Sequence, residues 1–247
     1  MLKGNVAFQH VYFKYEQSEE AYTLKNVSFQ VKPGQTVALV GATGAGKTTI
    51  LQLIARFYEV TKGEVLFDGI NVQQIERGAL RSQMAFVLQD PFLFEATVRE
   101  NIRYGRLDAS DEEIEEAAQR ANAHEFIMKL KDGYDTLLAA DGSEISQGQK
   151  QLLSIARALI ADPKILLLDE ATSSIDTVTE LAIQEALDTL MKGRTSFVIA
   201  HRLNTVHNAD IVLVMQKGEL VEAGPQQKLI ASGGIYAQML ESSAHHL

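Results

Sequence analysis

Apolar and polar residues alternate with a period of two in the first third of the chain. The stretches "VAFQHVYFKY" (6–15) and "LKNVSFQVK" (24–32) have this pattern, which is typical of strands with one buried face. We therefore predict two antiparallel strands near the N terminus and a further strand over "GEVLFDG" (63–69). Near the other end, "DIVLVMQKGELVEAG" (210–224) predicts a hairpin that turns at Lys217-Gly218.

Continuous apolar runs predict a second kind of strand, buried on both faces. There are three of them: "TVALVG" (36–41), "KILLLDE" (164–170) and "TSFVIAH" (195–201). Helical patterns follow the first two, at "TTILQLIARF" (48–57) and "TELAIQEALDTLM" (179–191). This alternation of strands and helices indicates a mainly parallel sheet with crossover helices.

The middle of the chain, from about residue 90 to 160, is helical in pattern and more charged. It reads as a lobe inserted between two sheet strands. Its acidic run, "DASDEEIEEAAQR" (108–120), contains Ser110 and Glu113 at the spacing of a capping box, so we interpret it as a solvated helix start rather than a metal site. We expect one domain over 1–247, with a core of 1–89 and 160–247 and a helical subdomain of 90–159.

Composition narrows the functional classes. The 247 residues are 46% hydrophobic and 22% charged, as in ordinary globular proteins. No cysteine is present, which excludes disulfides and thiolate metal sites. The net charge of -9 argues against a broad nucleic-acid-binding surface. No apolar run reaches 18 residues and "MLKGNVAFQH" lacks the apolar core of a signal peptide, so we expect no membrane span in this chain.

The strongest chemical signal is "GATGAGKT" (41–48), which fits the phosphate-binding pattern G-x-x-x-x-G-K-[ST]. Gly44 and Gly46 let backbone N–H groups turn toward phosphate oxygens, and the following helix presents its N terminus to the anion. Lys47 supplies charge to the β and γ phosphates, and the Thr48 hydroxyl suits Mg²⁺. Because this loop follows a buried strand and opens a helix, we predict an α/β fold with a P-loop NTPase (RecA-like) core. The glycine spacing disfavours a dinucleotide site.

Polar residues at the ends of other strands fit the same chemistry. Asp169 and Glu170 close a buried strand, where Asp169 can hold Mg²⁺ through water and Glu170 can activate a water molecule. His201 ends the third buried strand, and Gln89 ends an apolar run before the helical lobe. Taken singly, these residues are also consistent with ordinary polar strand ends and loops. Together with the P-loop, they predict a Mg²⁺-dependent nucleotide triphosphatase.

Six motifs occur in the order found in ATP-binding cassette (ABC) ATPases, and the resemblance extends from about residue 5 to 240. They are "GATGAGKTT", "VLQD", "ISQGQ", "ILLLDE", "ATSSID" and "IAHRL". The phrases "QDPFLFEATVRENIRYG", "DEATSSIDTVTE" and "VIAHRLNTVHNADIVLVMQKGELVEAG" resemble the exporter branch of this family. The resemblance implies an α/β nucleotide-binding domain with an N-terminal antiparallel β subdomain and an inserted α-helical subdomain.

The resemblance also implies roles for individual residues. Tyr15 matches the aromatic residue that stacks on adenine; Tyr22 is a weaker match, and packing within the sheet is the alternative for Tyr15. Gln89, His201 and the stretch Ser173–Asp176 match the Q-loop, the switch histidine and the D-loop. Residues implied to contact ATP are Tyr15, Gly41, Thr43, Gly44, Ala45, Gly46, Lys47, Thr48, Thr49, Ser146, Gly148, Gln149 and Asp176. The implied catalytic residues are Glu170, His201, Gln89 and Lys47, and the implied Mg²⁺ ligands are Thr48, Gln89 and Asp169.

In such ATPases two nucleotide-binding domains pair head to tail, with ATP between the P-loop of one and the signature loop of the other. Ser146 and the N terminus of the helix after "SQGQ" would then face the partner's γ-phosphate. The implied partners are a second such domain and the transmembrane domains of an exporter. The implied location is the cytoplasmic face of the cell membrane, as part of a transporter.

Three departures from the family pattern matter, and the first two lie on the partner-facing side. Gln147 stands in "ISQGQ" where the commonest form, L-S-G-G-Q, has glycine, while Ile145 for leucine is mild. Ala140 and Asp141 replace a Glu-Arg pair, and Gln226 replaces a histidine. The ATP-binding residues are all present, which suggests one half of a heterodimeric, multidrug-type exporter; a homodimer is the alternative.

Other classes of function fit the sequence less well. A stand-alone importer ATPase is disfavoured by the exporter phrases. A module that dimerises without turnover is disfavoured by Glu170 and His201. A soluble ATPase that acts on DNA or ribosomes is disfavoured by the acidic composition and by the lack of a second cassette.

Overall fold

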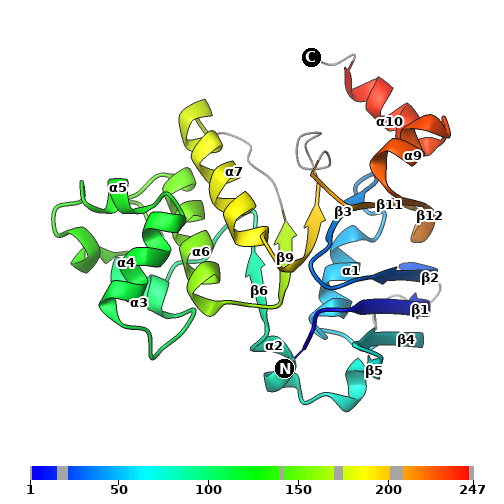
Figure 1. Cartoon of the computed structure of the whole chain (residues 1–247), viewed down its shortest axis with the longest axis horizontal. Coiled ribbons are helices and arrows are strands. Elements are labelled where there is room, and N and C mark those ends of the chain that lie inside the picture. Colours follow the sequence, from blue (N-terminus) through cyan, green and yellow to red (C-terminus); the bar gives the residue numbers. More distant parts are fainter. Residues whose placement is uncertain (1, 16–21, 140–141, 170–174, 201–207, 245–247) are drawn as a thin grey trace. The chain divides into compact units, whose positions relative to one another are not determined.

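The computed structural model describes residues 2–15, 22–139, 142–169, 175–200 and 208–244 (Figure 1). The chain divides into two compact units. The first comprises the described residues of 1–84, 164–169 and 193–247, and the second comprises those of 85–163 and 170–192. Among the described residues, no helix combines the length and the apolar character needed to span a lipid bilayer.

The first unit contains an antiparallel sheet in the order β2-β1-β4-β5. Its strands are β1 (Val6–Phe13), β2 (Leu24–Val31), β4 (Lys62–Phe67) and β5 (Ile70–Asn71). β1 pairs antiparallel with β2 and β4, which confirms the alternation read from the sequence.

The buried face of β1 changes phase part-way along the strand. Phe8 and Val11 are both buried although three positions apart, and the pairing with β2 shifts register between them. His10 lies in this shift and has a φ of 49°. A bulge of this kind inserts one extra residue, so that Val11 faces the core although it is three positions after Phe8.

A second sheet in this unit has the order β12-β11-β3-β10-β9. Its strands are β3 (Thr36–Val40), β9 (Ile165–Asp169), β10 (Thr195–Ile199), β11 (Ile211–Gln216) and β12 (Glu219–Gly224). β10 pairs in parallel with β3 and β9, and β11 pairs in parallel with β3. This confirms the mainly parallel sheet and the α/β class. β12 is antiparallel to β11 across Lys217-Gly218, whose φ angles of 49° and 83° suit a tight hairpin turn.

The helices of the first unit lie beside these sheets. They are α1 (Lys47–Ile54), α2 (Arg77–Arg81), α9 (Gln226–Ala231), α10 (Ile235–Ala244) and the 3-10 turn η1 (Val72–Gln74). Leu229 of α9 and Tyr236 of α10 pack with residues of β3 and β11 in one buried cluster. α1 is shorter than the pattern over 48–57 predicts, because Arg56 turns to a φ of 53° and ends it.

The second unit is mainly helical. It contains α3 (Val98–Arg103), α4 (Asp111–Arg120), α5 (His124–Ile127), η2 (Gly133–Asp135), α6 (Gln147–Ala161) and α7 (Thr177–Met191). Short strands β7 (Ala96–Thr97) and β8 (Leu137–Leu138) pair with each other, and β6 (Met84–Val87) begins at the boundary between the units. The capping box predicted at Ser110 and Glu113 starts α4, with both reciprocal hydrogen bonds formed. α7 belongs to this unit and starts two residues before the predicted position.

Candidate functional site

The glycine-rich loop between β3 and α1 is held in place by the β11–β12 turn. The Gly218 N–H donates to the Ala45 carbonyl at 3.2 Å, and the Gly218 carbonyl accepts from the Lys25 N–H at 2.8 Å. At Gly41 the backbone of β11 comes so close that an added Cβ would lie 2.2 Å from the Met215 carbonyl oxygen. The loop therefore depends on glycine for its fit against β11 as well as for its curvature.

The N terminus of α1 has no cap from a side chain. Its N-cap residue, Gly46, makes no side-chain hydrogen bond, and its first turn contains no acidic residue. The N–H groups of the first turn of a helix have no partner within that helix, and the helix dipole makes this end positive. These N–H groups adjoin a cavity of about 210 Å³ that Thr43, Gly44, Lys47 and Thr48 help to line. This end of α1 is therefore suited to an anion.

Lys47 is the cation of this cavity, and its side chain is folded back onto the loop. Its Nζ donates to the carbonyls of Gly41 at 2.7 Å and Ala42 at 2.9 Å. Burial lowers the pKa of the ammonium from its usual value, and the charge of Asp169 opposes this shift. An ammonium group has three donors, so the geometry leaves capacity for a phosphate oxygen.

Tyr15 is anchored beside this loop. Its hydroxyl donates to Gln52 Oε1 at 2.7 Å and lies 3.1 Å from the hydroxyl of Thr49, on the first turns of α1. Its ring makes edge contacts with Phe13 and Tyr58, at centroid distances of 4.8 and 5.1 Å. Tyr15 lies two residues beyond the end of β1, and its ring packs on Phe13, the last residue of that strand. The structure thus brings the side chains of Tyr15 and Thr49 together.

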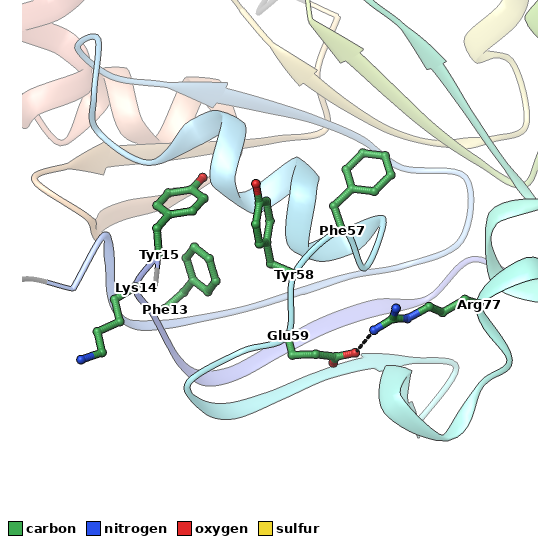
Figure 2. A pocket seen from close by; sticks show the side chains of 7 residues that line it. All are labelled: Phe13, Lys14, Tyr15, Phe57, Tyr58, Glu59 and Arg77. Atoms are coloured by element: carbon green, nitrogen blue, oxygen red, sulfur yellow. Dashed lines mark hydrogen bonds and ion pairs between the residues drawn. The ribbon is translucent and has the colours of Figure 1, made fainter. Parts of the chain in front are cut away.

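The same aromatic side chains line a larger pocket of about 530 Å³ (Figure 2). Figure 2 shows Phe13, Tyr15, Tyr58 and Phe57 along one side of it, while Glu59 and Arg77 form an ion pair at 3.0 Å on another. Lys14 lies beside Phe13 and Tyr15, so aromatic rings and charged groups both line the pocket.

The predicted metal ligands are oxygen donors. Thr48 is exposed on the first turn of α1, and Asp169 is half-buried at the end of β9. A single carboxylate with a hydroxyl fits Mg²⁺, which keeps water ligands and takes others from phosphate. Gln89 is exposed in the second unit, just after β6. Glu170, Ser173 and His201 lie outside the described residues.

In the second unit, the signature-like stretch forms the start of α6. The Ser146 hydroxyl oxygen accepts from the Gln149 N–H at 3.2 Å, and Gln149 Oε1 accepts from the Ser146 N–H at 2.9 Å. Ser146 is therefore a helix cap, as its position predicts, and its hydroxyl hydrogen remains available as a donor. Asp176 similarly caps α7 by accepting from the Thr179 N–H at 3.0 Å, and this bond lowers the pKa of its carboxyl group.

Comparison with known proteins identifies the family. The model of the family described as "ABC transporter" matches residues 24–173, which is more than half of the chain. The chain belongs to the ABC transporter family. The resemblance seen in the sequence motifs is thereby confirmed.

The relatives of this ABC domain are larger proteins. It is 57% identical over 239 residues to an uncharacterized ABC transporter ATP-binding protein, YfiC, of Bacillus subtilis, covering 97% of this chain and 39% of that protein. It is 49% identical over 238 residues to a fatty acid ABC transporter ATP-binding/permease protein of Mycobacterium bovis, covering 96% of this chain and 37% of that protein. The chain thus spans about two fifths of the length of these relatives.

A solved structure supports the exporter branch and the fold. A bacterial Atm1-family ABC exporter with ATP bound superimposes with a TM-score of 0.90 at 40% identity, over 98% of this chain and 42% of that one. The exporter resemblance is therefore favoured over the importer alternative, and the P-loop NTPase fold is confirmed.

The departures from the ABC pattern have different surroundings. The Gln147 side chain donates to Asp90 at 3.2 Å, within its own unit. The Gln226 amide donates to the Tyr236 hydroxyl at 3.1 Å and so joins α9 to α10. Ala140 and Asp141 lie outside the described residues.

Arg157 of α6 is an organising residue of the ABC helical unit that motif reading overlooks. Its guanidinium donates to the carbonyls of Asn101 at 2.8 Å and Phe92 at 2.9 Å, and it lies over the rings of Phe94 and Tyr104. The available signal was a cation within the apolar run "LLSIARALI" (152–160), because a buried cation must have acceptors.

Proposed function

We propose that this chain binds and hydrolyses ATP, with Mg²⁺, as the nucleotide-binding domain of an ABC exporter. The observation that carries the proposal is the positive, uncapped N terminus of α1 next to the Lys47 ammonium, which together form a receptor for phosphate. The similarity to an Atm1-family exporter with ATP bound supports the choice of nucleotide.

The phosphates of ATP are held by one continuous stretch of the chain, and the adenine is held by Tyr15. Backbone N–H groups within 41–49 surround the phosphates, and the Lys47 ammonium exchanges its loop carbonyls for phosphate oxygens. The adenine stacks on Tyr15, whose bond to the Thr49 side chain supports placing the base next to the phosphates.

The Thr48 hydroxyl, the Asp169 carboxylate and the Gln89 amide oxygen are the groups that would hold Mg²⁺. When bound, the ion withdraws electron density from phosphate oxygens and stabilises the charge that develops on them. The charge of Asp169 acts on the pKa of Lys47, which supports placing Asp169 near the phosphate-binding loop.

Hydrolysis uses residues at the ends of β9 and β10. Glu170 accepts a proton from the attacking water molecule, and His201 contacts the γ-phosphate or that water. Both positions follow parallel strands whose carboxyl ends form one edge of the sheet, where ligands of such sheets bind.

The site is completed by a second nucleotide-binding domain. The hydroxyl of Ser146, the backbone around Gly148, the Gln149 side chain and the D-loop residue Asp176 of one domain face the ATP of the other. The N terminus of α6 contributes its positive dipole to that contact. ATP then joins the two domains, and hydrolysis lets them separate.

The partner outside this chain is a membrane part. The chain spans only two fifths of relatives such as the ATP-binding/permease protein of Mycobacterium bovis, which supports an accompanying permease. We place the domain at the cytoplasmic face of the cell membrane, with the core of 1–89 and 160–247 and the helical subdomain of 90–159 acting as one domain. The substrate that is moved is recognised by the membrane part.

Two substitutions test this function together. We expect Glu170→Gln to lower ATP turnover by roughly 10²–10⁴-fold while ATP still binds. We expect Lys47→Ala to weaken ATP binding itself, by roughly 10- to 100-fold, because a charge-assisted contact is lost. Calorimetric binding and phosphate release are the measurements, and exposed Lys32→Ala is the matched control. Unchanged turnover in Glu170→Gln would show that Glu170 is not the catalytic base. Unchanged ATP affinity in Lys47→Ala would show that Lys47 does not bind the phosphates.

A further inference from the structure

Two glutamines on successive turns of α6 contact the segment that contains Gln89. Gln147 is the first residue of α6, and its Nε2 lies 3.2 Å from Asp90 Oδ1. Gln151 is one turn later, and its Nε2 donates to the Leu88 carbonyl at 3.2 Å. Residues four apart share one face of a helix, so the two amides form a pair of contacts along that face.

The direction of both contacts is determined by the acceptors. The Leu88 carbonyl and the Asp90 carboxylate are both acceptors and have no hydrogen to donate. Each glutamine must therefore present its NH₂ group. Gln151 is only 7% exposed, and its Oε1 has no partner among the described residues. The bond from Gln151 to the Leu88 carbonyl therefore lies in the interior of this unit.

These contacts lie on both sides of Gln89. Leu88 and Asp90 are its immediate neighbours, and the Phe92 carbonyl is held by Arg157, also from α6. Gln89 itself is exposed between the two held positions. The segment on both sides of Gln89 is therefore linked to the first two turns of α6.

We propose that Gln147 is a positioning residue that couples Gln89 to the N terminus of α6. The inference rests on the proposed roles of Gln89 at Mg²⁺ and of α6 at the partner's phosphate. A glycine at position 147 has no side chain to make this contact, so the departure from L-S-G-G-Q gives this chain a connection that the commonest form lacks. Through this connection, a change at the ATP site that contains Gln89 is transmitted to the N terminus of α6, which faces the partner's ATP site.

The test exchanges donor and acceptor while keeping both side chains the same length. In Gln147→Glu, two carboxylates face each other and repel. In the double variant Gln147→Glu/Asp90→Asn, the new amide donates to the new carboxylate and the bond is restored in reverse. Glutamate is also favourable in the first turn of a helix, so a role limited to stabilising α6 would make the single variant no worse than the unmutated chain.

The first readout is hydrogen exchange of the peptides over 86–95 and 143–155 in the full chain without nucleotide. We expect the single variant to exchange roughly two- to tenfold faster, which is the effect of one lost hydrogen bond, and the double variant to recover. Equal exchange in all three proteins, or no recovery in the double variant, would overturn the proposal.

The second readout is the Mg²⁺ concentration that gives half-maximal ATPase activity of the chain in the presence of a homologous partner domain, because loss of folded protein would not change it. We expect the single variant to need roughly two- to tenfold more Mg²⁺, with an unchanged KM for ATP, and the double variant to recover. Gln89→Ala distinguishes the proposed role of Gln89 at Mg²⁺ from the coupling through Gln147. If it leaves the Mg²⁺ requirement unchanged, the proposed role of Gln89 fails; if only Gln89→Ala raises it, the coupling through Gln147 fails.

Discussion

Tyr15 makes two kinds of interaction, one through its hydroxyl and one through its ring. The hydroxyl bonds to Thr49 and Gln52 hold the residue on α1, while the ring makes edge contacts with Phe13 and Tyr58. The sequence motif predicts the ring's role with adenine but not the hydroxyl bonds, because these depend on where α1 lies relative to the end of β1.

Substitution can separate the two interactions of Tyr15. We expect Tyr15→Phe to leave ATP affinity nearly unchanged and to lower the free energy of unfolding by about 0.5–1.5 kcal/mol, since hydrogen bonds to α1 are lost. We expect Tyr15→Ala to weaken ATP binding by roughly 5- to 150-fold through loss of stacking. Binding calorimetry and urea unfolding measure these effects. Tyr22→Ala is the control for the weaker match; if it weakens binding more than Tyr15→Ala, the adenine assignment is wrong.

The helices show which structural features can be predicted from residues close together in the sequence. Ser110 and Ser146 start α4 and α6 as their capping positions predict, because a cap bonds residues only three positions apart. Gly148 is different: the motif assigns it to phosphate, whereas an added Cβ would lie 2.3 Å from the Thr179 methyl group on α7. Its small size thus allows α6 and α7 to pack, a requirement that no local pattern expresses.

The packing of α6 on α7 can be tested with a compensating pair. We expect Gly148→Ala to lower the free energy of unfolding by about 1–3 kcal/mol, because the new methyl group collides with the Thr179 methyl group. Thr179→Ser removes that methyl group and keeps the hydroxyl, so the double variant should regain much of the loss. Urea midpoints of the four proteins form the cycle. Additive losses in the double variant would show that the two side chains do not compete for this space.

At the scale of the whole molecule, the sequence and the structure leave two modes of pairing open. The P-loop side of the chain has its expected residues, whereas the signature side carries Gln147, exposed beside the Ser146 cap. A side chain at this position adds bulk where a partner's phosphate would approach. If the domain pairs head to tail as proposed, this asymmetry predicts a different, homologous partner rather than a second copy.

The pairing mode makes a measurable difference in solution. We expect the Glu170→Gln chain to remain mainly monomeric with ATP and Mg²⁺ when purified alone, and to pair when a homologous domain with glycine at the Gln147 position is added. Light scattering after size exclusion gives the masses, and ADP in place of ATP is the control. Stable ATP-dependent homodimers, with two hydrolysing sites in the unmutated chain, would contradict the heterodimer.

By itself, the sequence determined the main strands and helices, the caps of α4 and α6 and the stretch that carries the phosphate-binding pattern. These properties depend on periodicity and on residues close together in the chain. Only the tertiary structure decided how the site is supported: Gly218 bonds to Ala45, and Gln147 to Asp90 from 57 positions away. Such contacts arise from strand order and helix packing, which bring distant segments together and which no local pattern encodes.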